Sequence, residues 1–107
     1  MFVWSRTIAT DLETVLADLK RDAYEKTGVE YFSRIQRSGT DLFIPCPNYA
    51  AHGGVEERTP SCSVDTETGM FNCFGCGFSG SLPVLVAKVL DLSTPVQGYR
   101  WLLKTYS

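Results

Sequence analysis

Residues 70–77 read Met-Phe-Asn-Cys-Phe-Gly-Cys-Gly and place Cys73 and Cys76 three positions apart in a glycine-rich turn. A Cys-x-x-Cys turn supplies two thiolates from one tight loop, as structural zinc sites require. The glycines at positions 75 and 77 allow positive φ angles, which other residues adopt only at a cost. The spacing therefore predicts a zinc knuckle.

Two other interpretations of the cysteine pair stand beside the zinc knuckle. A thioredoxin-like redox pair opens a helix inside a βαβ unit, and the flanking residues carry no such pattern. The second alternative is chance spacing of unrelated cysteines. A strand pattern before the pair and a helix pattern after it favour a structural metal site.

Two further ligands must come from upstream. Cys46 follows an apolar stretch and precedes a proline, which makes it the third candidate. The fourth is His52, the only histidine of the sequence, or Cys62. Cys62 alternates with Val64 in a predicted strand, which favours a small buried side chain, whereas His52 lies in a predicted loop over residues 47–60. With Cys62 as the alternative, the set expected for one structural Zn²⁺ ion is Cys46, His52, Cys73 and Cys76.

Working outward, two hairpins are predicted around the ligands. Residues 31–37 and 42–45 alternate around a Gly-containing turn, and residues 61–64 and 70–73 do the same around a second turn. Upstream, Thr10 and Glu13 form a capping box. The helix that follows it ends near residue 28 and has an apolar face made by Leu12, Val15, Leu16, Leu19 and Ala23.

Downstream, Ser81 is predicted to cap a helix over residues 82–92, and Thr94 a second one with Gln97 in its first turn. The expected fold is α+β, a small antiparallel zinc-ribbon sheet with an N-terminal helix and two C-terminal helices. We expect a single domain over residues 1–107. Its parts are the N-terminal helix (1–30), the zinc ribbon (31–80) and the C-terminal helices (81–107).

Composition limits the function classes. The sequence is 44% hydrophobic and 21% charged, which is typical of a folded protein, and its formal net charge of −2 provides no overall attraction to nucleic acid. Apolar stretches fall far short of the roughly 20 residues that span a bilayer, and the first residues lack the pattern of a signal peptide. We expect a cytoplasmic protein with reduced cysteines and no membrane partner.

With these residues in place, the sequence resembles the zinc-binding domain of DnaG-type DNA primases, a Cys-His-Cys-Cys zinc finger. Cys46 and its proline match the start of the family pattern, residues 57–64 (ERTPSCSV) match the middle, and residues 70–77 match the end. Two departures stand out: five residues instead of two separate Cys46 from His52, and Cys62 replaces the family's phenylalanine. Such variation fits a phage or mobile-element member.

The resemblance implies that the domain engages single-stranded template DNA. It would assist RNA primer initiation together with a separate primase catalytic (TOPRIM) subunit or a replicative helicase. Acidic residues are scattered rather than clustered for divalent ions, so we expect no catalysis from this chain alone. The alternative is a zinc-stabilised module that contacts a replication or transcription protein without binding DNA.

Candidate DNA contacts follow from the chemistry of single strands, which bind cations along their phosphates and aromatic rings against their bases. Arg58 falls where the family has lysine, and Phe74 lies inside the knuckle turn. For the arginines the alternative is a solvated surface, and for Phe71 it is packing against the knuckle. The candidates are Arg34, Arg37, Arg58 and Phe74.

Overall fold

The protein was analysed as a computed structural model, which describes residues 1–56 and 58–106 of the 107-residue chain. Within those residues the strands form a two-stranded sheet and a five-stranded antiparallel sheet of order β3-β4-β5-β6-β7. The expected α+β class is confirmed. The elements in chain order are β1 (Phe2–Val3), β2 (Arg6–Thr7), α1 (Leu12–Thr27), β3 (Gln36–Ser38), β4 (Asp41–Ile44), the 3-10 helix η1 (Tyr49–His52), β5 (Cys62–Asp65), β6 (Phe71–Cys73), β7 (Ser79–Gly80), α2 (Leu82–Val89) and α3 (Pro95–Tyr106).

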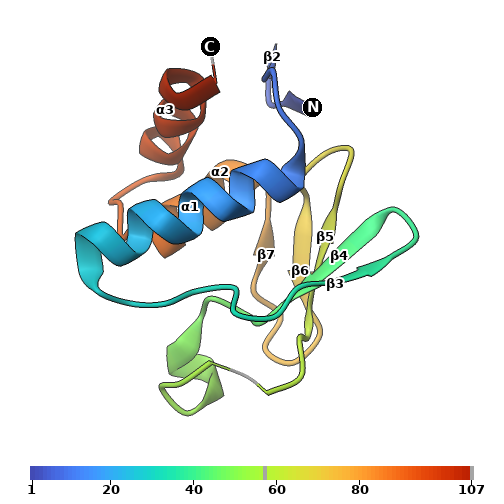
Figure 1. Cartoon of the computed structure of the whole chain (residues 1–107), viewed down its shortest axis with the longest axis vertical. Helices are drawn as coiled ribbons and strands as arrows, with labels where there is room; N and C mark the ends of the chain where they lie inside the picture. Colours follow the sequence, from blue (N-terminus) through green and yellow to red (C-terminus); the bar gives the residue numbers. More distant parts are fainter. Residues whose placement is uncertain (57, 107) are drawn as a thin grey trace.

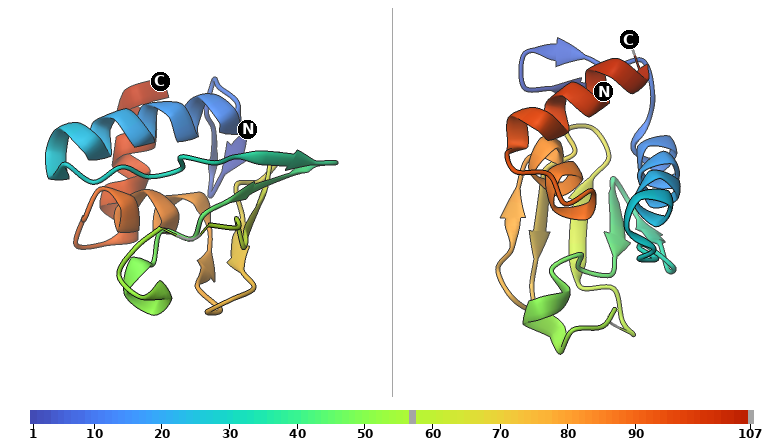
Figure 2. Two further views of the ribbon diagram at one scale, coloured as in Figure 1. Left: turned by 60° about the horizontal axis from the view of Figure 1, so that its bottom comes forward. Right: turned by 90° about the vertical axis from the view of Figure 1, so that its left-hand side faces the viewer.

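The elements divide the molecule into two ends. Figure 1 shows α3, the β1–β2 hairpin and both termini at one end, and η1 with the loops around it at the other. The side view in Figure 2 shows the same division. Between the two ends, a continuous buried cluster joins α1, the five-stranded sheet and α2. None of the described helices combines the length and the apolar character needed to cross a bilayer.

Helix α1 forms where the apolar periodicity predicts it. Its five apolar positions are at most 1% exposed, so one stripe of the helix packs into the core. The predicted N-cap is wrong by one residue: Asp11, not Thr10, is extended and accepts a hydrogen bond from the Thr14 N–H at 2.8 Å. Gly28 ends the helix in the left-handed conformation, with φ 75°.

The first hairpin is shorter than predicted. Its first strand begins at Gln36 instead of residue 31, because Phe32 adopts a left-handed φ of 53° and turns its ring into the core, where it is 3% exposed. A residue with positive φ cannot continue an extended strand. Gln36 pairs with Phe43 of β4, and the chain continues from the end of β4 to Cys46.

The second hairpin forms as predicted, with Cys62 opposite Cys73 and Val64 opposite Phe71. The sequence analysis missed β7, which pairs with the outer side of β6 immediately after the knuckle. A two-residue strand ending in glycine carries no periodic signal, because its pairing depends on the turn that brings it back.

The C-terminal helices are confirmed with one shortened boundary. Helix α2 ends at Val89 rather than residue 92, because Asp91 adopts a left-handed φ of 55°. Helix α3 crosses α2 closely at Gly98, where a Cβ atom would lie 2.2 Å from the Pro83 carbonyl oxygen. The Thr94 hydroxyl accepts a hydrogen bond from the Gln97 N–H at 3.4 Å, as the predicted cap requires.

The first residues form a hairpin that the sequence analysis did not predict. The Trp4 ring lies against Tyr99 of α3 with centroids 4.7 Å apart, and its Nε1 donates to the Ser81 hydroxyl at 2.9 Å. Ser81 occupies the N-cap position of α2, but its side chain bonds Trp4 rather than the helix. The hairpin therefore fastens the start of the chain to both C-terminal helices.

Candidate metal centre

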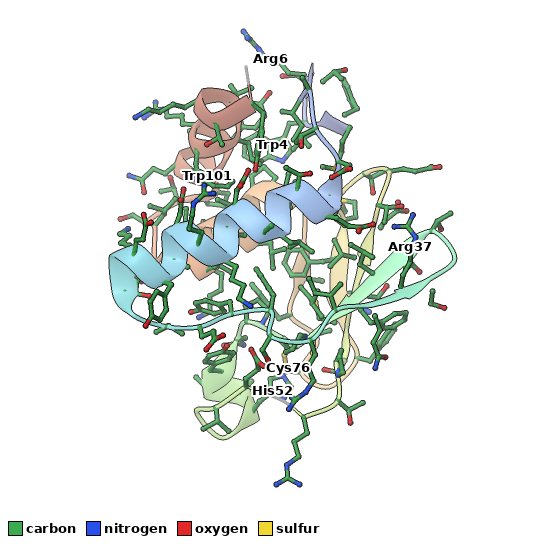
Figure 3. All side chains as sticks on the ribbon, viewed as in Figure 1. Trp4, Arg6, Arg37, His52, Cys76 and Trp101 are labelled. Carbon is green, nitrogen blue, oxygen red and sulfur yellow. The ribbon has the colours of Figure 1, made fainter. Side chains whose placement is uncertain are left out.

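Four Cys and His side chains converge at the end of the molecule that carries η1. Cys46 lies two residues beyond β4, His52 is the last residue of η1, Cys73 ends β6 and Cys76 lies in the turn after it. Their ligand atoms all lie within 4.8 Å of one another, and Figure 3 shows His52 and Cys76 side by side. The structure thus brings together the four residues that the sequence analysis selected.

The spacing of these atoms fits a tetrahedral zinc ion. The Sγ atoms of Cys46 and Cys76 lie 3.7 Å apart, and the Cys73 Sγ lies 3.6 Å from the His52 Nε2. Zn–S bonds of about 2.3 Å and Zn–N bonds of about 2.0 Å at tetrahedral angles give an S–S separation of about 3.8 Å and an S–N separation of about 3.5 Å. Three thiols and one imidazole are also the ligand types that structural zinc prefers. Both the donor set and its dimensions therefore suit zinc.

Backbone hydrogen bonds hold the knuckle. The Gly77 N–H donates to the Cys73 carbonyl at 2.9 Å, and the Cys73 N–H donates to the Phe78 carbonyl at 2.8 Å. The Phe74 N–H donates to the Ser61 carbonyl at 3.0 Å, which ties the turn to the start of β5. The two cysteines therefore keep their positions through contacts of the main chain.

The two knuckle glycines serve different purposes. Gly77 has a φ of 77°, as predicted. The prediction is wrong for Gly75, whose φ is not positive: a Cβ atom there would lie 3.0 Å from the His52 Cε1. Gly75 is needed for the space that the imidazole ring occupies, a requirement that arises only after folding.

Cys62, the alternative fourth ligand, lies in the core. It is fully buried in β5, where it faces Ile44 on one neighbouring strand and Cys73 on the other. The converging group contains His52 and not Cys62. This placement agrees with the small buried side chain that strand alternation indicated.

The thiols of Cys46 and Cys73 differ in their tendency to ionise. Burial raises the pKa of the Cys46 thiol. Burial also opposes ionisation of Cys73, but hydrogen bonds from the Ser61 hydroxyl and from the N–H groups of Cys76 and Gly75 outweigh it and lower the pKa of its thiol to about 6. Cys73 is therefore ready to bind a metal as a thiolate, whereas binding at Cys46 releases a proton.

The candidate DNA contacts lie on different segments of the fold. Phe74 is 69% exposed at the knuckle, and Arg58 is exposed in the loop before β5. Arg34 is exposed in the connection between α1 and β3. Arg37 lies on β3 and forms an ion pair with Glu13 of α1, and Figure 3 shows it well away from His52 and Cys76.

Phe71 is a core residue. It is 4% exposed and packs against Phe78 with ring centroids 4.9 Å apart. This contact agrees with the alternative that Phe71 packs against the knuckle. Of these two phenylalanines, only Phe74 therefore presents an exposed ring.

Two residues near the centre escaped the sequence analysis. The Tyr49 hydroxyl donates to the Glu30 carbonyl at 2.8 Å and to a Glu56 carboxylate oxygen at 3.2 Å. Both residues flank His52 in a segment whose composition indicated only a loop. No local pattern could have revealed them, because their partners lie across the fold.

A short antiparallel sheet whose loops present three cysteines and one histidine defines a zinc-ribbon protein. The CHC2 zinc finger family, the zinc ribbon of DnaG, matches residues 12–95 of this chain. The chain belongs to that family.

Curated relatives support the assignment. A DNA primase of Lactococcus lactis subsp. lactis (strain IL1403) is 36% identical over 73 residues, which cover 68% of this chain and 10% of the relative. A DNA primase of Geobacillus stearothermophilus is 42% identical over 50 residues, covering 47% and 7%. A DNA primase of Enterococcus faecalis (strain ATCC 700802 / V583) is 31% identical over 64 residues, covering 60% and 9%.

The likeness covers only a small part of each relative. The chain spans about a tenth or less of the length of the curated relatives it matches. The comparison with solved structures found no match. All four members of the converging Cys-His-Cys-Cys group lie within the matched residues 12–95.

Proposed function

We propose that this chain is the zinc-binding module of a DnaG-type primase and that it holds one structural zinc ion through Cys46, His52, Cys73 and Cys76. The observation that carries the proposal is the convergence of these four side chains, whose ligand atoms all lie within 4.8 Å of one another, in a member of the primase zinc-ribbon family. Bound zinc supplies a cross-link between the loop after β4 and the knuckle after β6. It performs no chemistry of its own in a site closed by four protein ligands.

Substitution of each candidate fourth ligand by alanine tests the zinc proposal. His52→Ala is expected to lose zinc during dialysis against a chelator, because three thiolates remain in an open site. Cys62→Ala should keep one zinc per chain and lose only folding stability, since it empties a core position. Metal analysis of both proteins against the wild type gives the stoichiometry. Retention of zinc by His52→Ala and its loss from Cys62→Ala would refute the ligand set.

In the second part of the proposal, the module contacts single-stranded template and works with a separate catalytic (TOPRIM) subunit or a replicative helicase. Support comes from the exposed Phe74 ring in the knuckle turn and from exposed Arg58 in the loop before β5, both in segments that adjoin a candidate ligand or the strand leading to one. Stacking on an aromatic face contributes about 1–3 kcal/mol per base. Arg34 lies on a neighbouring connection, while Arg37 must leave Glu13 to reach phosphate.

Titration with a labelled single-stranded oligonucleotide at several salt concentrations tests DNA binding. Arg58→Glu is expected to weaken binding, and loss of one phosphate contact lowers the salt slope by about 0.7. Phe74→Ala should weaken binding at every salt concentration. Lys104→Glu, an exposed charge reversal on α3, is the control and should leave the affinity unchanged. If the zinc-loaded chain ignored the oligonucleotide even at low salt, the DNA proposal would be wrong.

A protein-interaction module without DNA contacts is the second candidate. The net charge of −2 and the pairing of Arg37 with Glu13 favour it, because both reduce the positive potential available to phosphates. A zinc-loaded chain that binds a purified catalytic subunit or helicase in the absence of DNA, and shows no affinity for oligonucleotides, would select this function.

A further inference from the structure

His52 sits in a segment that is fastened on both sides. Three residues before it, the Tyr49 hydroxyl donates to the Glu30 carbonyl at 2.8 Å, and the ring stacks on Tyr31 with centroids 5.1 Å apart. Four residues after it, the Glu56 carboxylate accepts hydrogen bonds from the Ser33 hydroxyl and from the Ser33 N–H. The Tyr49 hydroxyl also donates to Glu56 at 3.2 Å, which joins the two attachments.

The local backbone transmits these attachments to the imidazole. Tyr49 and His52 are the first and last residues of η1, and a 3-10 helix has three residues per turn, so the two side chains lie on the same side. The Gly54 N–H donates to the Tyr49 carbonyl at 2.7 Å and closes the turn. The backbone of η1 thus holds Tyr49 and His52 in a fixed relation to each other.

An unsupported loop would weaken a metal site. Five residues separate Cys46 from His52, and ordering such a segment at the moment of binding costs backbone entropy for every residue that becomes fixed. Contacts that order the segment in advance remove part of that cost. The contacts of Tyr49 and Glu56 reach the connection between α1 and β3, which is anchored in the core through Phe32.

We propose that Tyr49 and Glu56 are positioning residues for the metal centre: they hold His52 where it meets the three cysteines and link metal retention to the connection between α1 and β3. The inference rests on the proposed zinc function and deepens it. Linkage is reciprocal, so metal binding also orders this connection, which carries Arg34. Metal occupancy thus acts on a segment proposed to contact DNA.

Removal of single hydroxyl groups tests the inference in the full chain. Tyr49→Phe is expected to lower zinc affinity roughly fivefold, the equivalent of one hydrogen bond, and to speed zinc release to a chelator. Tyr106→Phe is the matched control, because it deletes a tyrosine hydroxyl that donates to Asp18 at 2.7 Å on the far side of the molecule. It should leave zinc affinity unchanged.

Two further variants protect the test against a folding defect in Tyr49→Phe. Glu56→Gln leaves one acceptor oxygen in place of two, and Ser33→Ala removes the hydroxyl donor. Each variant weakens the other half of the attachment and should speed zinc release while one zinc per chain is retained. Hydrogen exchange of residues 29–35 should rise on zinc removal in the wild type, and less so in Tyr49→Phe. A purely structural role would not couple exchange in this connection to zinc.

The outcomes separate the inference from the proposed function. Zinc affinity and release in Tyr49→Phe, Glu56→Gln and Ser33→Ala within twofold of those in Tyr106→Phe would overturn the positioning role and leave the zinc proposal standing. A wild-type chain that retained no zinc would overturn both.

Discussion

The His52 ring fits beside the knuckle because position 75 carries no side chain. A Cβ atom at Gly75 would approach the His52 Cε1 to 3.0 Å and the Cys73 Sγ to 3.7 Å. The first separation is closer than ordinary van der Waals contact, so either the ring or the knuckle would have to move. The imidazole and the turn therefore constrain each other within a few tenths of an ångström.

Gly75→Ala is accordingly expected to weaken zinc binding while the sheet and helices still form. Competition with a chromogenic chelator measures the affinity, and circular dichroism checks the fold. Gly39→Ala is the control: Gly39 has a φ of 62° in open space at the β3–β4 turn. It should cost about 1–2 kcal/mol of stability without changing zinc affinity. Equal zinc affinity in both variants would contradict the steric argument.

Helices α1 and α3 are each positioned by a contact that depends on a single side chain or on its absence. Helix α3 reaches α2 where Gly98 meets the Pro83 carbonyl. Helix α1 begins where Asp11 caps the Thr14 N–H. The two contacts differ in kind, because one needs space and the other needs a hydrogen-bond acceptor.

Gly98→Ala is expected to destabilise the fold by roughly 1–3 kcal/mol, because its methyl group would lie 2.2 Å from the Pro83 carbonyl oxygen and force α3 away from α2. Urea unfolding followed by circular dichroism measures the change. Val96→Ala, an exposed position on the same helix, should stay within about 0.5 kcal/mol of the wild type. Equal stability of the two variants would show that the helices separate freely.

The Asp11 cap makes α1 sensitive to acid. Hydrogen bonds from Thr14 lower the pKa of the Asp11 carboxyl below its ordinary value of 3.8. The cap therefore stabilises the fold fully above that value, and its contribution is lost as the pH falls through the lower pKa of the folded state. Asp11→Asn keeps an acceptor without a titrating group, so its stability should fall less steeply with acid. Urea unfolding of both proteins at a series of pH values measures this dependence. If the carboxylate were irrelevant, the free energy of unfolding would fall equally steeply with acid in both proteins.

The whole molecule combines a packed core with an end that carries the candidate metal centre. The buried cluster joins α1, the sheet and α2, and the loops that bring His52 and Cys76 to the centre lie at its edge. Domains of this size bury only about two-thirds of their unfolded surface, so a cross-link adds a large share of their stability.

Removal of the metal is expected to lower the melting temperature markedly. A ligand at about 1,000 times its dissociation constant contributes about 4 kcal/mol, which corresponds to a shift on the order of 15–30 °C for a domain of this length. Calorimetry with and without a chelator measures the shift. Added zinc should restore the transition, and added magnesium should not. An unchanged melting temperature would mean that the four side chains hold no stabilising ion.

Much of the architecture was predictable from local patterns. The face of α1, the second hairpin and the Cys-x-x-Cys turn each depend on residues within a few positions of one another, and periodicity reports such relations directly. The same patterns separated Cys62 from the converging group, because alternation placed it beside Val64 inside the sheet. Spacing along the chain was enough to select all four residues that converge.

The remaining features arise from contacts between distant segments. The N-terminal hairpin exists because Trp4 meets Tyr99, and the attachment of His52 exists because Tyr49 reaches Glu30. Partners separated by many residues leave no periodic trace, and their pairing depends on how helices and strands pack. Local sequence thus predicted most of the elements and the candidate ligands of this zinc ribbon, because both depend on neighbouring residues, whereas packing between elements decided which distant segments meet around those side chains.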